Sequence, residues 1–191
     1  FSYASDGWHP ITALLKELYV KNKEPDLFYK YFHSYQPTQS SHLPLLCGTS
    51  VNFSPEVLIL PWGGFSRKTF LNGGTPLRKT SWLIGPLSED DIALNINRTI
   101  NVYKNIKSNG YRPWLPTNSF IQGVLLVKSN GDKRFVVTHG KHRVGVLSFL
   151  GYNTFKAQFD PNMFKIISEN EISSWYYVKN GKCSQADAAA Y

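Results

Sequence analysis

The clearest hydrophobic pattern in the chain lies at residues 88–109, where apolar residues recur at helical spacing. Ser88 is suited to cap the start, Asp91 completes a capping box three residues later, and Asn109-Gly110 is a natural stop. The pattern predicts one amphipathic helix over this range. Its apolar positions are Ile92, Ile96, Ile100, Tyr103 and Ile106.

Two shorter amphipathic helices are predicted near the N-terminus. Pro10 suits the first turn of one, and Pro25 opens the other, which ends at Gln36-Pro37. Each needs another part of the protein to cover its apolar face. The apolar residues are Ile11, Leu14, Leu15 and Leu18 in the first, and Leu27, Phe28, Tyr31, Phe32 and Tyr35 in the second.

The second half of the chain reads as strands, turns and one further helix. Apolar runs at 120–127 and 135–137 flank Asn130-Gly131, which is a strong signal for a β-hairpin. A turn at 138–143 and a helix up to Leu150 follow, with Gly151 as the stop. Strands are expected at 154–159 and 163–167. Ser184 with Asp187 indicates a last capped helix.

The long segment at 38–84 lacks the hydrophobic periodicity that predicts helices elsewhere in the chain. It holds many Ser, Pro, Gly and Thr residues, with one plausible strand at 57–60. Loops of this length inside a compact domain are usually functional or mobile. We therefore hypothesise that 38–84 fold over a pocket as a lid.

The composition fits a folded, basic protein. The 191 residues are 42% hydrophobic and only 18% charged, with a formal net charge of +8, which favours anionic partners. We expect one compact α+β unit with a small mixed β-sheet and flanking helices. It would consist of an N-terminal helical and loop extension (1–84), a core (85–168) and a helical tail (169–191).

The cysteines and the hydropathy of the chain indicate the cellular compartment in which the protein is expected. Cys47 and Cys183 are far apart and have no metal-like spacing, so two free thiols in a reducing compartment are expected. No apolar run approaches the roughly 20 residues of a membrane helix, and the start of the chain does not resemble a signal peptide. These features predict a cytoplasmic protein without a membrane span.

The most informative stretch for chemistry is Thr138-His139-Gly140-Lys141-His142-Arg143. It predicts a strand end, a tight glycine turn and the start of a helix that opens with three potentially cationic side chains. Backbone N–H groups at a helix N-terminus and adjacent cations are suited to bind a phosphate or another anion. An exposed basic turn without a ligand is the alternative.

The order of these elements resembles the ParB/sulfiredoxin-like superfamily. The shared features are a helix ending in glycine, the proline of Tyr111-Arg112-Pro113 before a first strand, a hairpin, and a Gly-x-x-Arg turn at Gly140–Arg143. The resemblance covers about 88–160. The arrangement of segments is also similar to bacterial proteins that carry such a domain, some encoded with surface-glycan genes.

The resemblance implies that the turn holds nucleotide phosphates. ParB proteins bind CTP there, sulfiredoxins bind ATP, and a related free-serine kinase uses ADP. Carried over to this chain, Gly140 would allow close backbone approach, and Lys141 and His142 would donate backbone N–H groups. Arg143 would supply a fixed charge. The ligand would be ATP, ADP or CTP with Mg²⁺.

Two residues of this chain differ from the family pattern and limit the reactions that the resemblance implies. Lys141 stands where sulfiredoxin has its reactive cysteine, which argues against sulfinic-acid repair. His139 stands where the serine kinase has an acid, so a kinase would need another general base. His139 is the candidate for that base, and the alternative is that it only hydrogen-bonds the turn. Only 31 residues follow position 160, too few for the DNA-binding module of ParB proteins together with a dimerisation tail.

The functional hypothesis is therefore a nucleotide- or phosphate-binding domain. Whether it is an enzyme stays open; if so, it would be phosphotransferase-like, acting on a small metabolite or glycan precursor. Arg98, Arg112 and His9 are additional candidates for the site, and no metal site is expected, since no Cys or acidic ligand accompanies His139 and His142. The alternative is a non-enzymatic nucleic-acid-binding module of ParB-like type, favoured by the charge.

Overall fold

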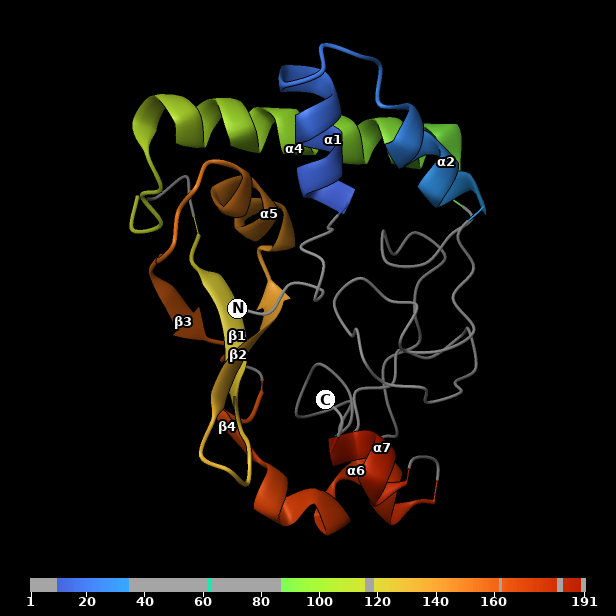
Figure 1. Cartoon of the computed structure of the whole chain (residues 1–191). Helices are drawn as coiled ribbons and strands as arrows, with labels where there is room; N and C mark the ends of the chain where they lie inside the picture. The colour runs from blue at the N-terminus through green and yellow to red at the C-terminus, as the bar shows by residue number, and fades with distance from the viewer. Residues whose placement is uncertain are drawn as a thin grey trace.

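A computed structural model describes residues 10–34, 62, 87–115, 119–161, 163–181 and 184–189. Figure 1 shows a layer of helices above a small sheet, with short helices near the C-terminus below it. The expected α+β class, with a mixed four-stranded sheet and flanking helices, is confirmed. The expected lid at 38–84 and the strand at 57–60 lie outside the described residues, apart from Trp62.

The longest helix, α4, spans Glu89–Asn109, as the hydrophobic pattern predicts. The Ser88 hydroxyl accepts a hydrogen bond from the Asp91 backbone N–H at 3.2 Å, which confirms the N-terminal cap. Gly110 ends the helix with φ 73° and donates its N–H to the Ile106 carbonyl. The helices α1 and α5 pack against α4 (Figure 1).

The N-terminal helices are α1 (Pro10–Tyr19) and α2 (Asp26–Ser34), close to their predicted bounds. Together with α4 they form two apolar clusters. One gathers Leu14 of α1, Phe28 and Phe32 of α2, and Leu87, Ile92 and Ile96 at the start of α4. The other gathers Ile11 and Leu15 of α1 with Tyr103 and Ile106 of α4 and with residues of β1 and α5.

The sheet is centred on β1 (Ile121–Val127). β2 (Lys133–His139) pairs antiparallel on one side, which confirms the hairpin. On the other side, β3 (Ala157–Phe159) runs parallel to the first half of β1, and β4 (Ile166–Ser168) runs parallel to the second half. The expected strands at 154–159 and 163–167 are thus shorter or shifted, because each pairs with only three residues of β1.

The helix after the turn, α5, spans Lys141–Phe149 and lies between the sheet and the layer of α1 and α4 (Figure 1). Its sequence has little helical periodicity because it is covered on more than one side. Four successive residues are buried: Val144, Gly145, Val146 and Leu147. α5 therefore holds its N-terminus in a fixed position beside the end of β2.

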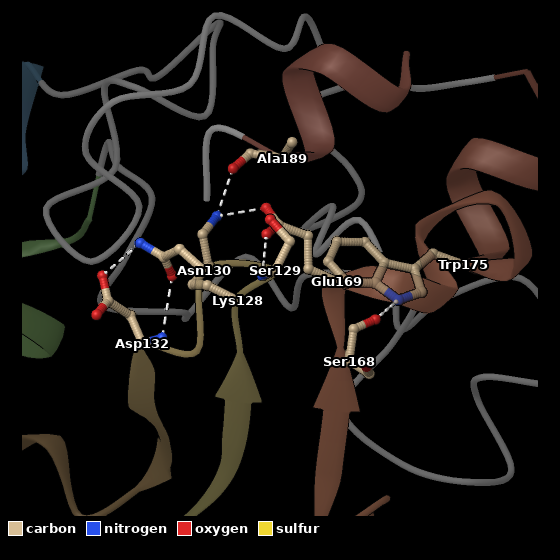
Figure 2. Close-up of polar contacts among 8 residues, drawn as sticks. All are labelled: Lys128, Ser129, Asn130, Asp132, Ser168, Glu169, Trp175 and Ala189. Carbon is tan, nitrogen blue, oxygen red and sulfur yellow. Dashed lines mark hydrogen bonds and ion pairs between the residues drawn. The ribbon is translucent and has the colours of Figure 1, made fainter.

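The C-terminal residues form short helices: η2 (Glu169–Ser174), α6 (Tyr176–Lys179) and α7 (Gln185–Ala189), the last beginning beside Ser184 as its cap predicts. A polar network joins η2 and α7 to the hairpin turn (Figure 2). The buried Glu169 carboxylate accepts a bond from the Lys128 ammonium at 2.8 Å and from the Ser129 N–H at 2.5 Å. Lys128 also donates to the Ala189 carbonyl. The bonds that Glu169 accepts from Lys128 and Ser129 lower its pKa to about 2.

None of the helices within the described ranges is long and apolar enough to cross a membrane.

Candidate functional site

The predicted turn at 138–143 is shorter than expected and consists of Gly140 alone. β2 continues to His139, and α5 begins at Lys141. Gly140 is the N-cap of α5 with φ 89° and ψ 24°, a left-handed conformation, and no side chain caps the helix. Its carbonyl accepts the N–H of Val144 at 3.1 Å. The positive end of the α5 dipole therefore lies directly at the end of β2.

Glycine is required at position 140 for a second reason. A Cβ atom there would lie 3.1 Å from Ile121 Cγ1 and 3.2 Å from Ile121 Cα. It would also lie 3.1 Å from Nη2 of Arg143. Because Gly140 has no side chain, its backbone packs closely against Ile121 at the start of β1. The Arg143 guanidinium lies beside the same turn.

The Arg143 guanidinium is held in place by the segment that enters β1. Its Nη1 donates to the Ser119 carbonyl and to the Ser119 hydroxyl, the latter at 2.7 Å. Burial lowers the pKa of Arg143, and the nearby Tyr111 opposes that shift. An arginine keeps its proton under these conditions. Arg143 is therefore a fixed cation at the N-terminal turn of α5.

Tyr111 positions the strands beside this turn. Its hydroxyl accepts the Ile121 N–H at 3.0 Å and donates to the Lys156 carbonyl at 3.1 Å. Burial raises the pKa of Tyr111, so its hydroxyl keeps the proton it donates. The Asn-Gly-Tyr-Arg-Pro segment after α4 thus fixes the start of β1 and the residue before β3.

The His142 side chain turns away from the sheet toward α4. Its Nδ1 lies 2.9 Å from the Thr99 hydroxyl, and that hydroxyl donates its only hydrogen to the Asn95 carbonyl at 2.8 Å. With the Thr99 hydroxyl donating to Asn95, its oxygen can accept a hydrogen from Nδ1 of a neutral His142. Burial, followed by the charges of Arg98, Lys141 and Arg143, lowers the pKa of His142 to about 4. His142 is neutral at pH 7, so it adds no charge to the turn.

Three cations remain close to the N-terminal turn of α5, since the charges of Arg98, Lys141 and Arg143 all act on His142. Burial lowers the pKa of Lys141 to about 8, so most of it is protonated at pH 7. Arg98 extends from α4 and is exposed. The structure therefore brings the candidate Arg98 to the site.

The other additional candidates are Arg112 and His9. Arg112 is exposed in the segment after α4, directly after Tyr111. His9 lies outside the described residues.

A carboxylate that the sequence analysis missed lies beside the turn. Asp160 follows β3 directly and its side chain is fully buried. Its Oδ2 accepts the Thr138 hydroxyl at 2.8 Å and lies 3.4 Å from Nε2 of His139. The His139 side chain is 61% exposed, so one nitrogen faces a buried carboxylate while the ring borders solvent.

Two sequence signals could have found the missed residues. Asp160 stands at the end of a predicted strand, where an acid is neither needed for the strand nor favoured by it. Thr99 interrupts the apolar stripe of α4 between Ile96 and Tyr103, and it is fully buried. A buried hydroxyl on an apolar stripe needs a hydrogen-bond partner, which His142 provides.

The arrangement has two chemical capacities. Arg98, Lys141 and Arg143 with the α5 N-terminus favour an anion, and the His139–Asp160 pair can accept or release a proton. Within the described ranges, no three or more His, Cys, Asp or Glu side chains gather so that they could hold a metal ion.

Comparison of the chain with protein-family models, with curated proteins and with solved structures finds no match.

Proposed function

We propose that this protein binds the phosphate groups of a nucleotide, or of another phosphorylated small molecule, at the Gly140 turn. The observation that carries the proposal is the uncapped, left-handed Gly140 at the start of α5, together with the three cations beside it. The helix N-terminus supplies backbone N–H groups and a positive dipole end. The resemblance to nucleotide-binding domains with a Gly-x-x-Arg turn supports the same ligand.

Each cation has a distinct role in this proposal. Arg143 is held by Ser119 through Nη1, so a phosphate would meet a charge whose orientation is already fixed. Lys141 and Arg98 add charge from two different elements, α5 and α4. Neutral His142 joins these elements through Thr99, which keeps Arg98 and the turn in register.

The proposal extends to a phosphotransferase-like enzyme that acts on a small hydroxylated metabolite or glycan precursor. A proton acceptor, His139, lies at the residue before the turn. Phosphoryl transfer requires mainly positioned phosphates, neutralised charge and an oriented nucleophile, and the fixed cations would supply the first two.

Calorimetric titration of the whole chain with ATP, ADP and CTP, each with Mg²⁺, tests the proposal. We expect at least one nucleotide to bind and Arg143→Ala to weaken its binding about tenfold or more, because a charge-assisted contact is lost. Arg134→Ala is the matched control. Arg134 is an exposed arginine on β2, roughly 16 Å along the strand from His139. Absence of binding by all three nucleotides would refute the proposal.

A second candidate function is nucleic-acid binding. The Trp114 ring is 56% exposed, and the Lys156 ammonium lies 4.9 Å from its centre. An exposed aromatic ring beside a cation is suited to stack on a base of a single strand. Binding of an oligonucleotide that weakens steeply with salt and is lost in Trp114→Ala would favour this function over the first.

A further inference from the structure

The contact between His139, Thr138 and Asp160 adds a chemical role to the candidate site. Burial of a carboxylate is costly unless hydrogen bonds or an opposite charge compensate it. Asp160 is fully buried, and both the Thr138 hydroxyl and the His139 imidazole address the same oxygen, Oδ2. Two adjacent residues of β2, the last two before Gly140, therefore contribute to this compensation.

We propose that His139 accepts the proton of a hydroxyl acceptor during phosphoryl transfer, and that Asp160 and Thr138 are positioning residues for that step. This inference rests on the proposed function and names the substrate class, a small alcohol. His139 and Gly140 are consecutive, so their Cα atoms are about 3.8 Å apart, and the imidazole belongs to the residue directly before the turn.

The two ring nitrogens of His139 have different roles in this proposal. Nε2 faces Asp160 Oδ2 at 3.4 Å, and contacts of this kind are commonly longer before substrate binds. A neutral imidazole with its hydrogen on Nε2 presents the lone pair of Nδ1. Because the ring is 61% exposed, an acceptor hydroxyl can reach it. Thr138 fixes the carboxylate from the buried side.

In the proposed transfer, two bonds break and two bonds form. The O–H bond of the acceptor breaks, and its proton goes to Nδ1 of His139. The acceptor oxygen forms a bond to the terminal phosphorus of a nucleoside triphosphate. The bond from that phosphorus to its bridging oxygen breaks, and the diphosphate leaves with the electron pair. Asp160 stabilises the imidazolium, which then loses the proton to solvent.

Release of phosphate from MgATP by the whole chain, with water as the acceptor, tests the step. A general base contributes a factor of 10² or more, so His139→Asn should lower kcat about 100-fold with little change in KM. Asp160→Asn and Thr138→Val should lower kcat less. His33→Asn is the matched control, because His33 is also an exposed histidine beside a carboxylate, Glu89, at 2.8 Å on other elements.

The double variant His139→Asn/Asp160→Asn shows whether Asp160 acts through His139 or affects kcat independently of it. If Asp160 acts through His139, adding Asp160→Asn to His139→Asn should lower kcat no further, because residues that act as a unit are non-additive. Multiplicative losses would overturn the positioning role. Thermal unfolding of each variant shows whether it is folded. Nitrogen NMR of the wild type requires no variant, and a hydrogen on Nδ1 of neutral His139 would overturn the proposal.

The two proposals fail in different ways. If MgATP binds but is not turned over, or if His139→Asn turns it over like the wild type, the proton-transfer role is refuted and nucleotide binding stands. If no nucleotide binds, the proposed function is refuted and this inference with it.

Discussion

Replacement of Gly140 by alanine tests how the candidate site is built. The backbone of Gly140 is left-handed, with φ 89°, which costs an alanine about 1 kcal/mol. The added Cβ would also lie 3.1–3.2 Å from two Ile121 atoms, one of them in the backbone. Overpacking of this kind typically costs about 1–3 kcal/mol. We therefore expect Gly140→Ala to lower the free energy of unfolding by about 2–4 kcal/mol in total.

Gly131→Ala separates the two contributions. Gly131 lies in the hairpin turn with φ 88°, almost the φ of Gly140, but no other atom lies within 4 Å of an added Cβ. Its substitution should therefore cost only the backbone contribution of about 1 kcal/mol. Urea unfolding of both variants, followed by circular dichroism, gives the difference, which is the packing of Gly140 against β1.

Equal losses of stability in the two variants would show that Ile121 does not restrict position 140. Nucleotide titration adds a second comparison, because the new Cβ would lie 3.1 Å from Nη2 of Arg143 in the Gly140 variant alone. Affinity should fall in Gly140→Ala and stay unchanged in Gly131→Ala.

Two further predictions concern acid stability. Glu169→Gln should cost about 2 kcal/mol at pH 7, since hydrogen bonds to a charged group are lost. The folded pKa of Glu169, about 2, is below its unfolded value, so this stabilisation is present above pH 4.5 and lost as the pH falls toward 2. Urea unfolding against pH measures it, and exposed Glu171→Gln should show no such loss. His142 has a folded pKa of about 4 against 6.5 unfolded, so its protonation favours unfolding as the pH falls from 6.5 to 4. His142→Asn should remove that slope, and an unchanged slope would contradict the assignment.

The sequence predicted correctly the helices and turns that are determined by residues close together in the chain. The α4 helix follows from its cap at Ser88, its apolar stripe and its stop at Gly110. The β1–β2 hairpin follows from Asn130-Gly131 between two apolar runs. The strand at 154–159 was predicted too long, because strand length depends on the partner, and β3 pairs with β1 over only three residues.

The site was predicted only in part. Gly140 and Arg143 were found because a glycine turn before a helix is a local pattern. The roles of His142 and Asp160 were not visible, since each depends on a residue distant in the sequence: Thr99 lies 43 positions from His142, and Thr138 lies 22 positions from Asp160. The neutral state of His142 likewise follows from burial and from the convergence of three cations.

The sequence by itself determined the helices, the hairpin and the position of a basic glycine turn, because caps, periodicity and turn residues act within a few positions of the chain. The tertiary structure decided which cations reach that turn, which histidine is neutral, and that a buried carboxylate lies behind His139. These properties arise when α1, α4 and β1 pack around α5 and when β3 places Asp160 beside the end of β2. Burial and charge proximity are set by distance in space and not by distance along the chain.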